Sequence, residues 1–177
     1  HIVNTGVAGA SIATVAATIE AIRAPQGQAD GYVYLIIDND DAPEAPGRGP
    51  PPCGGARAGM IIDCFPFFNE LDVLEIRLHE LDGVVDRFVL AEAPLTHSGR
   101  PKPLHFQENR ARFSEFLPKI THIVVLDMPG GVDPFQREIH QRNAIMRGLA
   151  GAKDNDVLIL GDADEIARAS AIKGALP

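Results

Sequence analysis

A short apolar run followed at once by carboxylates constrains this chain more than any other stretch. Residues 157–160 are continuously apolar, which predicts a strand buried on both faces, because a strand with one wet face would alternate. Gly161, Asp162 and Asp164 follow it. In open α/β sheets ligands bind at the carboxyl ends of the strands, and two carboxylates in one turn can share a hard cation. An ordinary polar turn is the alternative interpretation, because Asp and Gly are common in turns.

The composition is that of a soluble globular protein with room for one domain, or for one incomplete domain and an appendage. Of its 177 residues, 45% are hydrophobic and 23% are charged, and the net charge of −8 argues against a general nucleic-acid-binding role. Residues 2–22 are interrupted by polar side chains and lack a basic start, so we expect neither a signal peptide nor a membrane span. Cys53 and Cys64 suggest no disulfide framework, which favours a reducing compartment.

Three segments are expected along the chain. Residues 1–41 form an N-terminal block of unknown role, with a helix expected over 11–24, a strand over 32–37 and a polar turn at the acidic residues 38–41. Residues 42–59 are rich in Pro and Gly and have little apolar bulk, which is typical of a linker. Residues 60–177 carry the remaining elements, and the chain ends shortly after the strand described above.

In this last segment apolar runs alternate with helical patterns. Strands are expected at residues 60–64, 86–92, 120–126 and 157–160, and helices at 70–82, 108–116 and 134–149. A strand, a helix and a second strand of these lengths indicate a right-handed parallel βαβ unit. The strand ends at residues 65–70, at Glu92 and at Asp162 would then share one edge of a parallel sheet.

Details of the two longer helices follow from the same patterns. In the first, four leucines lie on one face, Asn69 is the expected N-cap, and Arg77 is expected to face water. The second is expected to begin at Asp133 and Pro134, with Phe135 on its buried side. Between these helices, prolines in residues 93–109 predict a long ordered loop. Its His97 and His105 match no metal-ligand spacing and are expected to serve hydrogen bonding or packing.

Several blocks together resemble glycosyltransferase family 17. They occur in order and at plausible spacing over residues 60–166, at positions 61–72, 75–81, 96–106, 141–149 and 162–166. The first contains Phe-Pro-Phe-Phe-Asn-Glu, the third Thr-His-Ser-Gly, the fourth Gln-Arg-Asn-Ala-Ile and the last Asp-Ala-Asp-Glu-Ile. Such a set is far more specific than any one Asp-x-Asp element.

The resemblance implies an α/β fold of the GT-A type, a Rossmann-like, mostly parallel sheet flanked by helices, truncated at its C-terminus. Residues 60–177 would be its donor-binding part. The implied activity is metal-dependent, inverting transfer of N-acetylglucosamine from UDP-N-acetylglucosamine to a glycan, such as an N-glycan, or to another hydroxyl acceptor. Animal members carry a membrane anchor that this chain lacks, so the resemblance implies a soluble, bacterial-type, cytoplasmic member.

The resemblance also implies roles for particular residues. Mn²⁺ or Mg²⁺ would be bound by Asp164, with Asp162 completing the metal shell or contacting the donor ribose. Arg142, paired with Asn143 on the preceding helix, would face the donor phosphates. The residues expected to hold uridine are Phe65, Asn69, Glu70 and Glu92. No residue is assigned as the general base that inversion requires.

Two other functions are compatible with an α/β layout. A nucleotidyltransferase that makes sugar nucleotides would share the metal, but the turn at residues 65–70 lacks the Gly-rich phosphate loop of that class. A carbohydrate-binding module could keep the fold without turnover. Metal-dependent binding of UDP would separate the transferase from such a module.

Overall fold

The computed structural model describes residues 2–5, 33–37, 59–153 and 155–175. Six strands form one sheet in the order β1-β2-β6-β3-β4-β5, and every neighbouring pair is parallel. The strands are β1 (Ile2–Thr5), β2 (Val33–Ile37), β3 (Ile61–Phe67), β4 (Arg87–Glu92), β5 (Ile120–Val124) and β6 (Val157–Leu160). The predicted α/β, Rossmann-like architecture is therefore confirmed. The predicted helix at residues 11–24, the acidic turn at 38–41 and nearly all of the linker lie outside the described residues.

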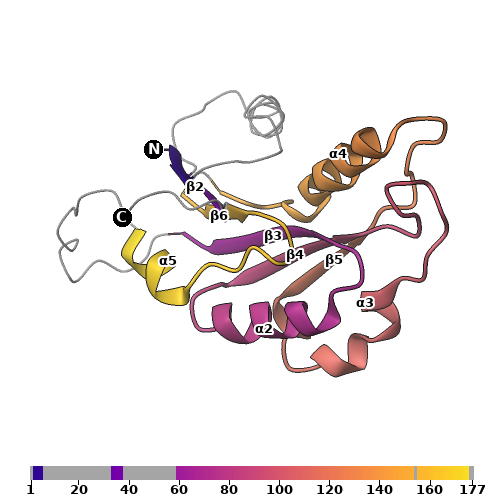
Figure 1. The fold of residues 1–177 in the computed structure, drawn as a ribbon. Coiled ribbons are helices and arrows are strands. Elements are labelled where there is room, and N and C mark those ends of the chain that lie inside the picture. Colours follow the sequence, from indigo (N-terminus) through magenta and orange to yellow (C-terminus); the bar gives the residue numbers. More distant parts are fainter. Residues whose placement is uncertain (1, 6–32, 38–58, 154, 176–177) are drawn as a thin grey trace.

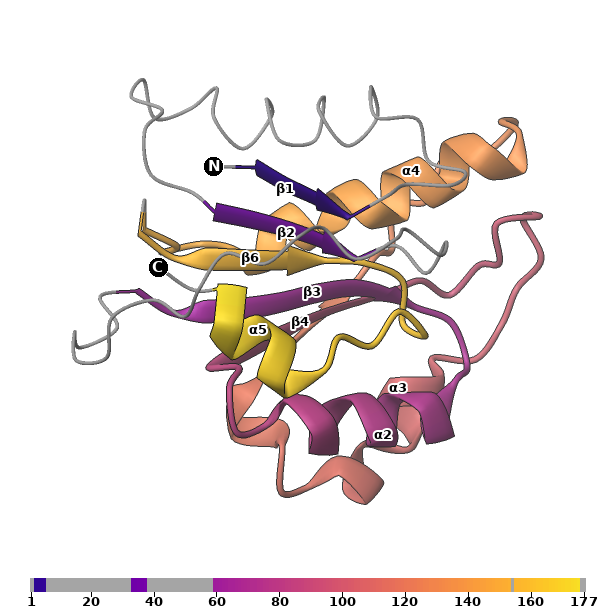
Figure 2. The same ribbon diagram turned by 60° about the vertical axis from the view of Figure 1, so that its left-hand side comes forward.

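Helices cover both faces of this sheet (Figures 1 and 2). Three lie on one face, α2 (Leu71–Leu81), α3 (His105–Glu108) and α5 (Ala169–Ala175), and α4 (Pro134–Ala144) lies on the other. Short 3₁₀ turns complete the layers: η1 (Arg110–Phe113), η2 (Leu117–Lys119) and η3 (Ile145–Gly148). No helix among the described residues is long and apolar enough to span a bilayer.

Strand β3 shows why the central strands read as continuous apolar runs. Ile61, Phe65 and Phe67 point into the core under α2, whereas Ile62 and Cys64 point into the core under α4 and η3. All five side chains are buried, because a parallel strand covered on both faces has no wet side. Burial also raises the pKa of the Cys64 thiol well above its ordinary value, so this side chain behaves as a neutral core residue.

Helix α2 forms where it was predicted, with two corrections. Its N-cap is Glu70 rather than Asn69, and no side chain caps it; the Glu70 carboxylate instead accepts hydrogen bonds from the backbone N–H groups of Phe68 and Asn69. Arg77, which was expected to face water, is fully buried. The sheet-facing side of α2 thus holds a guanidinium among its leucines, because Asp63 on β3 lies opposite it.

Helix α4 begins as predicted. The Asp133 carboxylate accepts a hydrogen bond from the N–H of Gln136 at 2.9 Å, and Pro134 occupies the first helical position. Phe135 was predicted on the buried side but is 48% exposed. The buried side chains are those of Arg137, Gln141 and Ala144. Similarly, the helix predicted over residues 108–116 is only the 3₁₀ turn η1.

Candidate functional site

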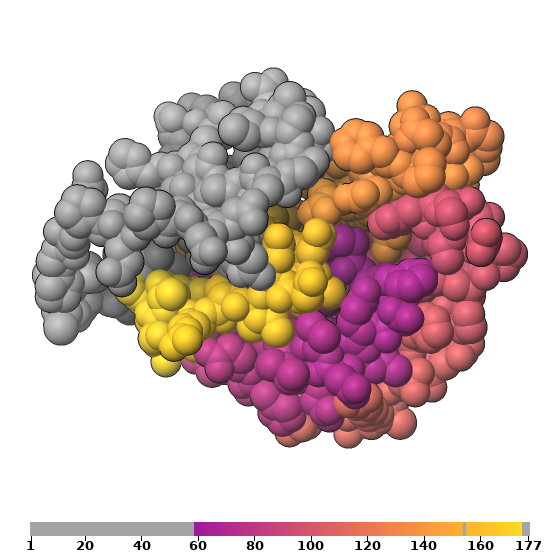
Figure 3. Space-filling model, viewed as in Figure 1, coloured from indigo at the N-terminus to yellow at the C-terminus, as the bar shows by residue number. Residues whose placement is uncertain are grey.

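A cavity of about 310 Å³ opens where β3 and β6 end at the carboxyl edge of the sheet. The surface is hollowed there, between the orange segment of α4 and the purple and yellow segments that follow β3 and β6 (Figure 3). The cavity is lined by Pro66, Phe67, Phe68, Glu70, His97, Glu138, Gln141, Arg142, Asp162, Ala163 and Asp164. Residues from four separate stretches of the chain therefore meet, as ligand binding at a parallel sheet edge requires.

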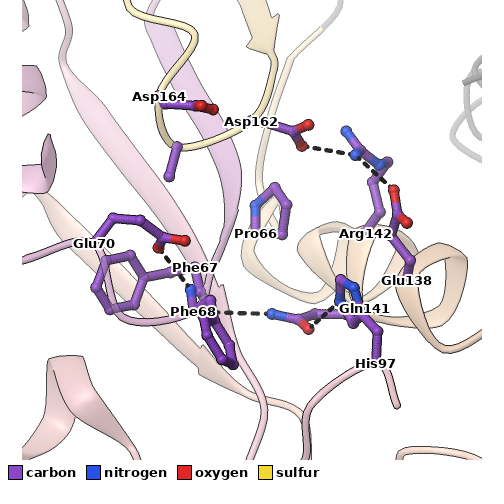
Figure 4. A pocket seen from close by; sticks show the side chains of 11 residues that line it. Pro66, Phe67, Phe68, Glu70, His97, Glu138, Gln141, Arg142, Asp162 and Asp164 are labelled. Atoms are coloured by element: carbon purple, nitrogen blue, oxygen red, sulfur yellow. Dashed lines mark hydrogen bonds and ion pairs between the residues drawn. The ribbon is translucent and has the colours of Figure 1, made fainter. Parts of the chain in front are cut away.

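One end of the cavity is charged. Asp162 and Asp164 lie there, and Arg142 on α4 reaches toward them (Figure 4). The Arg142 Nη2 donates to Asp162 Oδ1 at 2.7 Å and lies 3.4 Å from Glu138 Oε1, one helical turn back. The Asp164 carboxylate makes no hydrogen bond or ion pair with any residue that the structure describes. Asp162 is therefore paired with a guanidinium, whereas the Asp164 carboxylate has no partner within the described part of the chain.

The other end of the cavity is aromatic. Phe68 is 41% exposed and lines the cavity together with Gln141 and His97 (Figure 4). Lys102 Nζ lies over this ring, 5.2 Å from its centroid, and donates to the Phe68 carbonyl at 3.1 Å. Burial lowers the Lys102 pKa, an effect opposed by the Glu92 carboxylate nearby. The turn after β3 is thus fixed by Lys102 on one side and by the Glu70 carboxylate on the other.

The hydrogen bonds of Gln141 determine which His97 nitrogen carries a proton. The Gln141 amide nitrogen donates to the carbonyls of Ala91 and Phe67, at 2.9 and 3.1 Å. Its oxygen, which can only accept, therefore faces His97 Nε2 at 3.1 Å. A neutral His97 must carry its hydrogen on Nε2, which leaves Nδ1 with a free lone pair. In this tautomer Nδ1 is the acceptor nitrogen of a ring that lines the cavity.

Behind the charged end, a buried ion pair supports the loop that carries the two aspartates. Arg77 Nε and Nη2 donate to the two carboxylate oxygens of Asp63 at 2.8 and 2.7 Å. Arg77 Nη1 donates to the carbonyls of Asp162, Ala163 and Glu165 at 2.8, 3.2 and 3.0 Å. The pair joins β3, α2 and this loop, and the sequence pattern gave no sign of it.

The structure brings together four of the predicted site residues: Glu70, Arg142, Asp162 and Asp164 all line the cavity. The side chains of Asn69 and Asn143 are exposed and are not part of its lining. Sequence reasoning missed Phe68, His97, Gln141 and Glu138 as lining residues. Three of these four lie in the blocks of family resemblance, at positions 61–72, 96–106 and 141–149, which is the signal that could have identified them.

Phe65 and Glu92 are used inside the core and do not reach the cavity. Phe65 is fully buried, and the Arg77 guanidinium lies over its ring at 4.4 Å. Glu92 is also fully buried, where it accepts hydrogen bonds from the N–H of Phe106 at 2.9 Å and contacts His122 Nε2 at 3.1 Å. Phe65 belongs to the core cluster under α2, and Glu92 is bonded to Phe106 of the same cluster.

The acidic residues fit a cation that is shared with a ligand. Among the residues that the structure describes, no group of three or more His, Cys, Asp or Glu side chains could cage a metal. Mg²⁺ in particular is usually held by one or two carboxylates together with substrate phosphates and waters, not by an all-protein cage. Asp164 and Asp162 supply oxygen ligands of this kind at the edge of an open cavity. The donor set therefore suits Mg²⁺ or Mn²⁺ bound with a phosphate ligand.

Comparison with known proteins agrees with this geometry. Residues 55–174 match the family model of glycosyltransferase family 17. Over 115 residues the chain is 32% identical to the β-1,4-mannosyl-glycoprotein 4-β-N-acetylglucosaminyltransferases of Rattus norvegicus and Homo sapiens, and 31% identical to that of Mus musculus. The matched stretch covers 60% of this chain but 21% of each relative, so the chain spans about a fifth of their length. No solved structure matches the chain. With two thirds of its length matched by the family model, the chain belongs to glycosyltransferase family 17.

Proposed function

We propose that the cavity binds a UDP-sugar, with N-acetylglucosamine as the expected sugar, together with a divalent cation. The chain would be the donor-binding part of a GT-A-type enzyme that transfers the sugar, with inversion, to a hydroxyl group of a glycan acceptor. One observation carries the proposal: a single cavity has two carboxylates and a guanidinium at one end and an exposed aromatic ring with a histidine at the other. A nucleoside diphosphate has the matching parts, an anionic diphosphate and a planar base.

The charge of the cavity makes a cation necessary for such a ligand. The lining contains four carboxylates, those of Glu70, Glu138, Asp162 and Asp164, and the single guanidinium of Arg142. A diphosphate would be repelled by this excess of negative charge. We propose Asp164 as the principal cation ligand, because its carboxylate has no other partner among the described residues, with Asp162 as a second ligand or a ribose contact.

We propose that Arg142 contacts the diphosphate itself. Its side chain is 22% exposed, and its guanidinium pairs with Asp162 and Glu138 at the cavity wall. A planar guanidinium suits two-point contact with phosphate oxygens. When bound, the cation neutralises the charge that develops on the departing UDP. Arg142 would add a second positive charge near the same group.

The aromatic end of the cavity is the proposed binding site of the nucleobase. Phe68 is 41% exposed and can stack with a nucleobase, and Lys102, whose Nζ lies 5.2 Å from the centroid of its ring, holds the turn through the Phe68 carbonyl. His97 Nδ1, with its free lone pair, can accept a hydrogen bond from a ring N–H. Uracil carries such an N–H at its imide position, and cytosine has an acceptor nitrogen there instead. This difference supports UDP over CDP as the ligand.

Calorimetry with the whole 177-residue chain tests the proposal. We expect UDP to bind in the presence of Mn²⁺ and not after chelation with EDTA, and CDP to bind more weakly by about tenfold, the effect of one mispaired polar group. Binding of UDP that ignores the metal would contradict the cation site. No nucleotide binding, together with binding of free glycans, would instead indicate a carbohydrate-binding module.

A further inference from the structure

We infer that the buried Arg77–Asp63 ion pair positions the carboxylate loop, residues 161–166, so that Asp162 and Asp164 reach the cavity before any ligand arrives. The inference depends on the proposed function of that cavity, since it assigns a role in forming its cation site. Arg77 touches neither the cavity nor a ligand and is therefore a positioning residue. Its action on the site passes entirely through the backbone of the loop.

The first step of the argument is the direction of the loop carbonyls. Three of them, those of Asp162, Ala163 and Glu165, turn inward to the same nitrogen of Arg77. The Ala163 carbonyl is buried and the other two are partly buried, so these carbonyls require donors, because an unpaired buried carbonyl is costly. With these carbonyls fixed on the inner side, the side chains of Asp162 and Asp164 are carried outward to the cavity lining.

The loop is also closed upon itself. The Glu165 carboxylate accepts a hydrogen bond from the Asp162 N–H at 2.7 Å, and the Glu165 N–H donates to the Asp162 carbonyl at 3.1 Å. Gly161 permits this closure, because a Cβ there would lie 2.9 Å from Glu165 Oε2. The Arg77 contacts are added to this turn from beneath, so they select one orientation of a compact loop.

The energetics of buried ion pairs favour a positioning role over a purely stabilising one. Replacing a buried pair by apolar side chains of similar volume is often neutral or even stabilising, because both charges lose their hydration. Such a replacement could fill the space under α2 but could not donate to the three loop carbonyls. Lysine could not substitute either, since its ammonium lacks the planar fork that binds Asp63 and the loop together. What only arginine supplies here is the loop geometry.

The test uses the whole chain and a double variant, Arg77→Met with Asp63→Leu, which removes both charges and leaves no lone buried ion. The first measurement is hydrogen exchange of the loop amides of Asp162, Glu165 and Ile166, which donate within the loop. The second is the Mn²⁺ concentration that gives half-maximal UDP binding. We expect the exchange rates of these loop amides and the required Mn²⁺ concentration each to rise by about tenfold, as for the loss of a residue that orients a metal ligand. Amides inside α2 and β3 should keep their protection.

A matched control and a second variant keep the result interpretable. Arg112 pairs with Asp72 and Glu75 at the surface of the same helix, so Arg112→Met should change neither measurement. Arg77→Lys keeps a positive charge beside Asp63 but loses the planar fork of the guanidinium. Its loop exchange rates and its Mn²⁺ requirement should therefore also exceed those of the parent chain. If the double variant does not fold, the same two measurements are made on Arg77→Lys.

Two results would overturn the inference: unchanged exchange of the loop amides, or faster exchange with a parental Mn²⁺ requirement. If the parent chain binds no UDP at all, the proposed function fails by itself. The exchange measurement still decides whether the ion pair orders the loop, because it requires no ligand. Failure of the inference and failure of the proposed function are thus distinguishable.

Discussion

At the scale of single residues, the two aspartates of the Asp-x-Asp element differ in their partners. Asp162 is bound by Arg142, whereas the Asp164 carboxylate has no partner among the described residues. Asp164→Asn keeps the size of the side chain and removes its charge. We expect cation-dependent UDP affinity to fall at least about tenfold, since even an indirect metal partner contributes that much. Titration calorimetry with Mn²⁺ and UDP measures the loss. Asp38→Asn, in the other acidic cluster, is the matched control, and equal losses from both variants would place the site elsewhere.

Phe68 provides a second test at this scale. Phe68→Ala removes the proposed stacking surface and should weaken UDP binding by about 1–3 kcal/mol, the usual contribution of one stacked base. Phe135→Ala is the control, because that ring is exposed to a similar degree, 48% against 41%, but does not line the cavity. The two variants are compared by the same titration in Mn²⁺. Similar UDP affinities for the two variants would show that the nucleobase does not bind at the aromatic end of the cavity.

The cavity-lining residues that lie in short local motifs could be predicted from the sequence, and the residues that act through long-range contacts could not. Asp162, Asp164 and Arg142 lie at a strand end or on the helix before it, and short motifs mark such positions. Arg77 meets carbonyls that lie 85 to 88 residues away in the chain, and Gln141 meets carbonyls 50 and 74 residues away. No local periodicity encodes such contacts. A polar residue on an otherwise apolar helix face is read as solvent-facing unless its partner is known.

At the scale of elements, the end of β3 decides which phenylalanine is available to a ligand. The strand runs to Phe67, so Phe65 and Phe67 alternate into the core under α2, and Phe68 is the first ring beyond the strand. The sequence predicts the strand but places its end near residue 64, and a shift of this size exchanges the exposed ring for a buried one. The family resemblance implied Phe65 as one of four uridine contacts, but the structure buries its side chain. Element type was predictable here, whereas the element boundary that decides function was not.

The packing of η3 against the sheet gives a prediction at this scale. A Cβ at Gly148 would lie 2.4 Å from Val89 Cγ1 on β4 and 3.4 Å from side chains of β5. Gly148→Ala should therefore destabilise the protein by about 1–3 kcal/mol through overpacking, as measured by urea unfolding. Gly130→Ala is the control, since no atom lies within 4 Å of its Cβ position, and it should change stability by less than about 0.5 kcal/mol. Equal stability of both variants would show that η3 can move away from the sheet at little cost.

At the scale of the whole molecule, the strand that leads to the carboxylate loop lies inside the sheet. β6 pairs with β3 on one side, from Ile61↔Val157 to Cys64↔Leu160, and with β2 on the other, from Val33↔Val157 to Ile36↔Leu160. An edge strand next to a binding site would have unpaired backbone groups on its free side. Strand β2 comes from the N-terminal block of unknown role and pairs with that side of β6. The block therefore completes the backbone hydrogen bonding of the strand that leads to the carboxylate loop.

Limited proteolysis tests how the N-terminal block and the rest of the chain are joined. Residues 42–59 are rich in Pro and Gly with few apolar side chains, so we expect trypsin to cut first at Arg48 and Arg57, leaving a core that begins near Met60. Because β2 is hydrogen-bonded to β6, the released N-terminal fragment should elute together with the core in native size-exclusion chromatography and separate from it in urea. A variant with both Arg48→Gln and Arg57→Gln controls for the site of cleavage and should resist trypsin at these positions. First cuts within residues 60–166 would contradict the interpretation of residues 42–59 as a linker. Separate elution of the two fragments without denaturant would contradict the pairing of β2 with β6, and would leave that side of the carboxylate strand open after cleavage.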